Sequence, residues 1–189
     1  EAWFALPGLW STVRAIIEGY RRGTRFGIGV GDDGLVHQGA EGVQLTWMDA
    51  KVDGWVVTPR EGKPVEVNAL WYNALRRAAG LARGLVGQAG GAGAGTGAVR
   101  EGLAADVDAE LKALAADFEA EADPVRAAFE VFHGPVTGAL YDRIDPNGRP
   151  DPSVRPNQLF AVSLPNSPIA AGRARRVVEV VERELLVPL

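Results

Sequence analysis

The feature that most restricts the fold of this chain is a helical spacing of apolar residues that recurs in several segments. The clearest case follows Pro64, where an apolar stripe runs to residue 85 and the arginines lie mostly off it. The stripe consists of Leu70, Trp71, Ala74, Leu75, Ala78, Leu81 and Leu85. This spacing predicts an amphipathic helix that begins after Pro64.

Other segments show the same spacing. Residues 3–22 predict a first helix, and residues 103–118 predict a surface helix from near-heptad spacing. Pro124 should restart a shorter helix through Phe132, and a short helical turn is expected through "QLFAVSLP". Residues 170–186 predict a last amphipathic helix. Its inward-facing residues are expected to be Val177, Val178, Val181, Leu185 and Leu186.

The segments between the helices are long. "FGIGVGDDGLVHQG" alternates apolar residues around a turn signal and predicts a short hairpin. Residues 87–99 are low-complexity Gly/Ala and predict a flexible loop. No strands alternate with helices as a parallel sheet would require, so the fold class is all-α with long loops, which in compact domains are usually functional.

Composition narrows the function. The chain has 189 residues and a mass of 20.0 kDa, which fits one domain. Its charge of -4 and pI near 5.3 argue against a nucleic-acid or membrane partner and suit a neutral ligand. The absence of cysteine excludes disulfides and thiolate chemistry. No apolar run is long enough to span a bilayer and no secretory signal is visible, so a cytoplasmic setting is expected.

Several motif-based functions find no support. The chain has no GxxxxGK[ST], and the glycines of "GIGVGDDG" have the wrong spacing for a dinucleotide loop. The two histidines, His37 and His133, have no ligand-like spacing, so a histidine metal site or a Ser-His-Asp triad is weakly supported. His37 is expected to form hydrogen bonds within a loop.

The candidate chemistry that remains is that of carboxylates beside aromatic residues, in the window from Gly42 to Arg77. Asp49 follows Trp47 and Met48, and Asp53 and Trp55 come soon after. Indoles stack on sugar rings, and a carboxyl held against an indole has a raised pKa that suits proton donation. Glycoside cleavage needs such an acid and a second carboxylate. The alternative is that Asp49 caps a turn in an ordinary polar loop.

At this point a family resemblance becomes visible. "GVQLTWMDAKVDGWVVTPREGKPVEVNALWYNAL" and "RPNQLFAVSLPNSPI" resemble two blocks of the glycogen-debranching amylo-α-1,6-glucosidase family. "DDGLVHQGAEGVQLTWMDA", "LYDRID" and the opening "WFALPGLWSTVRAIIEGY" are similar to further stretches of it. The resemblance covers almost the whole chain except the Gly/Ala loop.

The resemblance implies an (α/α)6 toroid whose loops form a sugar-binding crater, present here in part over residues 1–189. It implies hydrolysis of α-1,6-linked glucose at branch points of glycogen or limit-dextrin-like α-glucans, with inversion and without a cofactor or metal. Asp49 would be the general acid and Trp47 a wall of the glucose subsite. Further positions that would line or support the crater are Lys51, Arg60, Lys63, Glu66, Asn68, Arg155, Asn157 and Gln158.

Two departures from the family pattern matter. The family usually has Gly-Asp where this chain has Asp53–Gly54, so the resemblance assigns Asp53 no role. A later block similar to "YHQGTVWPW", which completes the crater and supplies the base, has no counterpart here. We therefore expect a fragment that lacks the base region and is inactive in isolation. The alternatives are another inverting (α/α)6 glycosidase, trehalase-like or glucoamylase-like, and a non-catalytic glucan-binding module.

Overall fold

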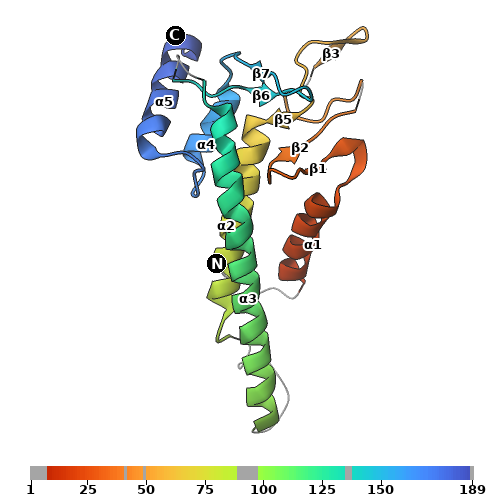
Figure 1. The fold of residues 1–189 in the computed structure, drawn as a ribbon, viewed down its shortest axis with the longest axis vertical. Helices are drawn as coiled ribbons and strands as arrows, with labels where there is room; N and C mark the ends of the chain where they lie inside the picture. Colours follow the sequence, from red (N-terminus) through yellow and green to blue (C-terminus); the bar gives the residue numbers. More distant parts are fainter. Residues whose placement is uncertain (1–7, 41, 49, 89–97, 135–137, 188–189) are drawn as a thin grey trace.

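A computed structural model describes the chain at residues 8–40, 42–48, 50–88, 98–134 and 138–187. Its long axis is a helical hairpin of α2 and α3, with α1 along one side, α4 and α5 on the other, and the strands gathered at one end (Figure 1). The helices are α1 (Leu9–Arg22), α2 (Val65–Leu85), α3 (Ala98–Ala128), α4 (Phe160–Ser163) and α5 (Ala171–Leu185). Three-residue to four-residue 3-10 turns occupy Arg25–Gly27, Phe129–Phe132 and Pro156–Leu159.

The helix predicted after Pro64 is confirmed as α2. It buries Trp71, Leu75 and Ala78 of the predicted stripe, whereas Leu70 at the edge of that stripe is exposed. Small residues allow a close approach of α3, whose Phe118 and Ala122 join the same core cluster. The α2–α3 hairpin is therefore the main hydrophobic core of the described chain.

The restart predicted at Pro124 is wrong, because α3 continues through it to Ala128. Proline removes one backbone donor, but the apolar face carries on across that point with Phe118, Ala122, Val125 and Phe129 all buried. Packing of this face against the core outweighs the local cost. A 3-10 turn, Phe129–Phe132, then ends the helical segment.

The two outer helices, α1 and α5, lie where the sequence predicts them, but some residues predicted to face inward do not. Helix α1 packs through Ile17, and the Tyr20 and Trp71 rings lie 5.7 Å apart. In α5 the buried residues are Val177 and Val180, which are three positions apart. The prediction that Val178, Leu185 and Leu186 face inward is wrong, because all three are exposed. Val181 is half-buried. Residues 1–7 lie outside the described part.

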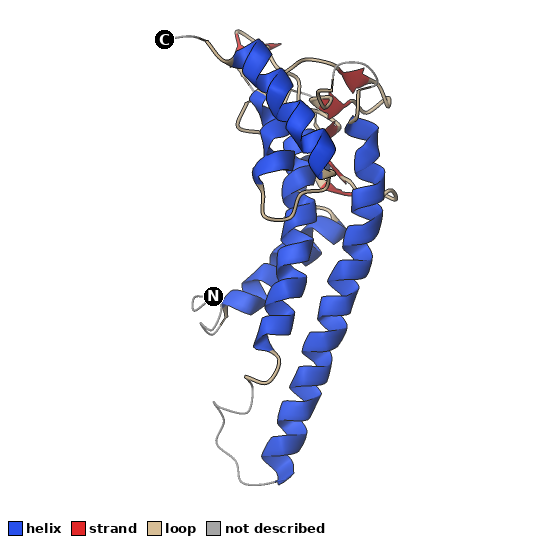
Figure 2. Ribbon diagram, turned by 90° about the vertical axis from the view of Figure 1, so that its left-hand side faces the viewer, coloured by secondary structure: helices blue, strands red, loops and turns tan. Residues whose placement is uncertain are grey.

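The loops form three small antiparallel sheets, a departure from the purely helical class. The predicted hairpin is confirmed as β1 (Gly29–Val30) paired with β2 (Val36–His37). The others are β3 (Lys51–Val52) with β4 (Trp55–Val56), and β5 (Lys63–Pro64), β6 (Arg143–Ile144) and β7 (Pro150–Asp151). All strands gather at one end of the α2–α3 hairpin (Figure 2).

Pairing across these sheets unites loops far apart in sequence. Lys63 is the register partner of Ile144, and an isolated bridge joins Gln38 to Gly62. The first hairpin, the segment before α2 and the segment around residue 144 are thus hydrogen-bonded together. Most of residues 87–99, the predicted flexible loop, lies outside the described part, and α3 already begins at Ala98.

Candidate functional site

The β3–β4 hairpin begins at Lys51, two residues after position 49. Asp53 and Gly54 form its two-residue turn, and both have a positive φ, 48° and 87°. A turn of this kind favours Asp-Gly, which gives the order of these two residues a structural reason. Val52 and Trp55 are register partners, and both side chains are exposed. The hairpin therefore presents apolar groups to solvent.

The segment around position 49 is tied to the strand that follows it. The Thr58 hydroxyl donates a hydrogen bond to the carbonyl of Met48 at 2.6 Å and accepts one from the amide of Ala50 at 3.3 Å. The amide of Val57 donates to the carbonyl of Ala50 at 2.8 Å. Asp49 itself lies outside the described residues.

Two residues after Thr58, Arg60 forms the centre of a buried ionic cluster. Its guanidinium contacts the carboxylates of Glu66, from the first turn of α2, and of Asp142, just before β6. The side chains of all three are almost fully buried. A buried cation between two carboxylates needs this pairing, because an isolated charge in the interior would be very costly.

Arg155 adds a second cation to Asp142. Its guanidinium lies 2.5 Å from Asp142 Oδ2 and 3.3 Å from Asp151 Oδ2. Asn157 is fully buried, and its Nδ2 donates to Asp142 Oδ1 at 2.8 Å and approaches Met48 Sδ at 3.4 Å. Asn157 thereby links the cluster to the segment that carries position 49.

The electrostatics of the cluster follow from burial and charge. Burial raises the pKa of Glu66, and the nearby Arg60 cation opposes this shift without cancelling it. Burial alone would raise the pKa of Asp151, but hydrogen bonds from Ser153 and the charge of Arg155 bring it below its usual range. Burial likewise disfavours the Arg155 cation, yet Asp142 and Asp151 hold its pKa above the ordinary value.

Comparison with known protein families gives a match over nearly the whole chain. A family model described as amylo-alpha-1,6-glucosidase matches residues 2–189. The chain belongs to the amylo-alpha-1,6-glucosidase family. No curated protein and no solved structure matches it. The family match spans every loop described above, so the cluster lies inside the matched domain.

The residues that the family resemblance predicts to line or support the site fall into two groups, one buried and one at the surface. Arg60, Glu66, Asn157 and Gln158 are buried, and most of their polar atoms are bonded to protein groups. Gln158 accepts from the Leu140 amide at 3.0 Å and donates to the Arg155 carbonyl at 3.0 Å. These side chains brace the loops from within.

Asn68 belongs to the same buried group. Its Oδ1 accepts from the Val36 amide at 2.7 Å, and its Nδ2 donates to the carbonyls of Val36 and Pro64 at 3.0 and 2.9 Å. This amide joins α2 to strand β2 of the first hairpin. Both of its polar side-chain atoms are thus hydrogen-bonded to the backbone.

The second group reaches the surface. Trp47 is 66% exposed and lines a shallow hollow of about 350 Å³ with Pro156, Leu159, Phe160 and Ser163. Lys51 is exposed, and its Nζ donates to the Gly42 carbonyl at 3.2 Å. Trp47 and Phe160 come from the two sequence blocks of the resemblance, and the fold brings these blocks together.

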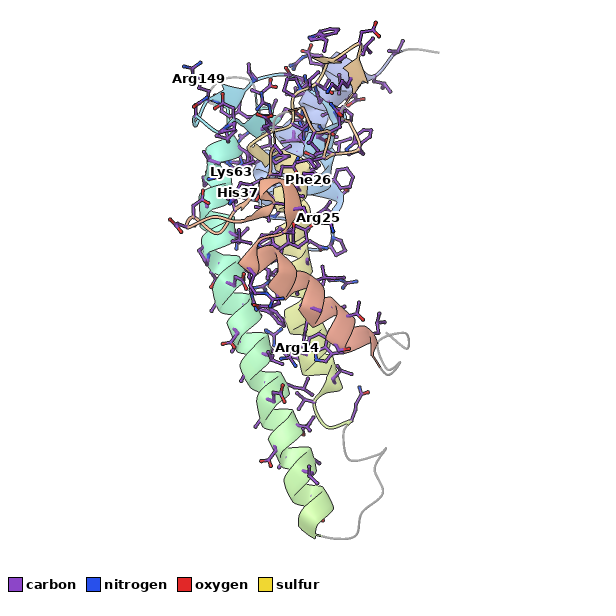
Figure 3. All side chains as sticks on the ribbon, turned by 90° about the vertical axis from the view of Figure 1, so that its right-hand side faces the viewer. Arg14, Arg25, Phe26, His37, Lys63 and Arg149 are labelled. Carbon is purple, nitrogen blue, oxygen red and sulfur yellow. The ribbon has the colours of Figure 1, made fainter. Side chains whose placement is uncertain are left out.

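Lys63 lines a different and larger opening. An open groove of about 970 Å³ lies between the β1–β2 hairpin and the loop after β6. Lys63 pairs with Asp33 at 2.5 Å there, and His37 lies on the same face (Figure 3). Carboxylates from Asp32, Glu61 and Asp145 also line it. The prediction that His37 lies in a loop is wrong, because His37 belongs to strand β2 and is the register partner of Gly29.

Sequence reasoning passed over Asp142, Asp151, Thr58 and Met48 as site residues. Asp142 could have been found by charge balance, because an arginine that the fold buries needs a carboxylate partner. The role of Thr58 and Met48 depends on loop geometry and left no such signal. Among the described residues no cluster of His, Cys, Asp or Glu could hold a metal ion. No described helix is both long and apolar enough to cross a bilayer.

Proposed function

We propose that this chain carries the acid side of a glucosidase that hydrolyses α-1,6-linked glucose at branch points of glycogen-like glucans. The observation that carries the proposal is the convergence of the matched motif blocks on one cluster. Asn157 of the "RPNQ" block contacts Met48 of the "TWMD" block and Asp142 of "LYDRID". Position 49 adjoins this junction.

In the proposed reaction the Asp49 carboxyl protonates the glycosidic oxygen as the bond to C1 breaks. A water molecule, deprotonated by a second carboxylate, attacks C1 from the opposite face, and the anomeric configuration inverts. Asp142 is unsuited to be that base, because Oδ2 is paired with Arg60 and Arg155 and Oδ1 accepts from Asn157. We assign Asp142 to the support of the site.

Substrate contacts are proposed for the exposed group. The Trp47 indole would stack on the apolar face of the terminal glucose, and Lys51 and Lys63 would bind hydroxyls. The half-buried Arg155 and the buried residues would hold the loops in place, the latter being Arg60, Glu66, Asn68, Asn157 and Gln158. We also propose that the chain forms part of an (α/α)6 toroid and that the protein acts in the cytoplasm.

The test uses the protein expressed from its complete coding sequence. We expect glucose release from a glycogen limit dextrin, none from trehalose, and β-glucose as the first product by NMR. Asp49→Asn should lower kcat by about 10²–10⁴-fold, the range for loss of a general acid. Equal activity of Asp49→Asn and the wild type would refute the acid assignment. Hydrolysis of trehalose in place of dextrin would favour a trehalase-like enzyme.

A second candidate is a glucan-binding module without turnover. The observation favouring it is the exposure of Trp47 and Trp55, two indoles available for sugar stacking. Dextrin binding by calorimetry, lost in Trp47→Ala and accompanied by no glucose release, would support this candidate against hydrolysis.

A further inference from the structure

The Thr58 side chain contacts the backbone on both sides of position 49. Its hydroxyl donates to the carbonyl of Met48 at 2.6 Å and accepts from the amide of Ala50 at 3.3 Å. A hydroxyl can donate one hydrogen bond and accept others at the same time, so one side chain satisfies both peptide groups.

We propose that Thr58 is the positioning residue of the acid: its hydroxyl fixes the two peptide groups that flank Asp49. The inference rests on the proposed function, since it assumes that Asp49 is the proton donor. Thr58 itself would contact neither the sugar nor the reacting atoms.

Thr58 is well placed to hold this backbone because its own position is fixed. Pro59 follows it and restricts the chain through its ring. Arg60 comes next, and its buried guanidinium is held by Glu66 and Asp142. Thr58 is therefore two residues from an anchor in the core. The residue that contacts Met48 is therefore held close to the buried cluster through the chain.

Two further contacts support the same segment. The Val57 amide donates to the Ala50 carbonyl at 2.8 Å, which continues the β3–β4 pairing toward position 49. On the other side, Asn157 Nδ2 approaches Met48 Sδ at 3.4 Å. Thr58 supplies the link between them, because its hydroxyl reaches both residue 48 and residue 50.

The consequence for catalysis is specific to proton donation. A misplacement of about 1 Å in a reacting group can cost about 10²-fold in rate. A poor leaving group such as a sugar hydroxyl needs the acid, whereas fluoride departs with little protonation. Loss of the Thr58 hydroxyl should therefore slow dextrin hydrolysis and leave hydrolysis of α-glucosyl fluoride nearly intact.

The experiment compares variants of the protein expressed from its complete coding sequence on both substrates. Thr58→Val keeps the shape and removes the hydroxyl, and Thr58→Ser keeps the hydroxyl. Thr12→Val is the matched control, since the Thr12 hydroxyl also bonds a carbonyl but lies on the exposed side of α1.

For Thr58→Val we expect kcat on dextrin to fall about 10- to 100-fold, with KM changed by less than about threefold. Its rate on glucosyl fluoride should stay within about threefold of the wild type, and the alkaline limb of its pH profile on dextrin should shift. Thr58→Ser should stay within about threefold on both substrates, and Thr12→Val should match the wild type.

The inference is overturned if Thr58→Val keeps its dextrin activity, if both substrates lose rate equally, or if Thr58→Ser fails as badly as Thr58→Val. Should Thr58→Val not unfold cooperatively, Thr58→Ser and Thr58→Ala form the comparison, because they differ only by the hydroxyl. Asp49→Asn separates the two proposals. If Asp49→Asn remains active, the proposed acid is wrong. If Asp49→Asn is inactive while Thr58→Val keeps the dextrin activity of the wild type, only the inference about Thr58 fails.

Discussion

At the scale of single residues, Arg60 shows how strongly this region depends on buried charge. Its side chain has no exposed surface and contacts Glu66 and Asp142. Arg60→Ala leaves two buried carboxylates with one fewer cation and should reduce the free energy of unfolding by about 3–5 kcal/mol. Urea unfolding followed by circular dichroism measures this loss.

Arg175→Ala is the matched control for the Arg60 substitution. Arg175 forms an exposed pair with Glu179 one turn along α5, and such pairs contribute little to stability. We expect no measurable change for this variant. Similar losses in the two variants would mean that the Arg60 cluster contributes no more than a surface ion pair does.

His133 gives stability a pH dependence. Burial lowers its pKa below the ordinary value of 6.5, and the neighbouring Glu130 only partly opposes the shift. The unfolded chain therefore binds this proton more readily, so stability falls as the pH is lowered through 6.5 toward the folded pKa. Between pH 7.5 and 5 the wild type should lose more stability than His133→Gln. Thermal unfolding at both pH values, with the surface variant His37→Gln as control, tests this; parallel losses would contradict it.

At the scale of elements, long helices could be predicted from sequence and two-residue strands could not. The period of the stripe from Trp71 to Leu85 predicts α2, because its apolar residues recur on one face of the helix, and that face packs into the core that α2 shares with α3. The pairing of Lys63 with Ile144 has no period to reveal it. It depends on a close backbone approach at Gly62, which only the folded chain brings about.

Gly62 is the tightest point where these strands meet. It has a φ of 95°, and a Cβ built there would lie 2.1 Å from the Ile144 carbonyl oxygen. Gly62→Ala should cost about 2–5 kcal/mol, from an unfavourable positive φ together with overlap against the backbone. Gly54→Ala is the control, because its φ is 87° but its added Cβ meets nothing within 4 Å.

The Gly54 variant should lose only about 1–2 kcal/mol, the cost of the positive φ alone. Chemical unfolding of both variants gives the difference between them. If Gly62→Ala is no less stable than Gly54→Ala, the close approach of Gly62 to the Ile144 carbonyl does not limit stability, and this explanation of the β5–β6 pairing is wrong.

At the scale of the whole molecule, the candidate site forms only when segments far apart in the sequence fold together. Position 49 and Arg60 belong to one block of the sequence and Asn157 to another, and the contacts of Asn157 with Met48 and Asp142, and of Asp142 with Arg60, bring the two blocks together. The family resemblance could single out the motif positions from the sequence. It could not separate the buried residues that brace the loops from exposed ones such as Trp47, because burial depends on how distant loops pack.

The same assembly leaves stability uneven along the molecule. The strands and the loops between them lie at one end of the α2–α3 hairpin, while the first part of α3 extends beyond the end of α2 (Figure 2). In that part Leu103 and Val107 are exposed, whereas Leu111, Phe118 and Val125 further along are buried. Amide protons of residues 101–108 should therefore exchange by local fraying, and those of 111–128 only by larger unfolding.

Hydrogen exchange with mass spectrometry on the 189-residue chain measures this gradient, and Gly102→Ala tests its cause. A Cβ at position 102 meets nothing within 4 Å, so alanine adds helix propensity of about 1 kcal/mol without new packing. Protection of residues 101–108 should rise up to about fivefold, since RT is about 0.6 kcal/mol, while that of 111–128 stays the same. Equal protection along the whole wild-type helix would show that α3 opens as one unit, held by contacts beyond its buried face.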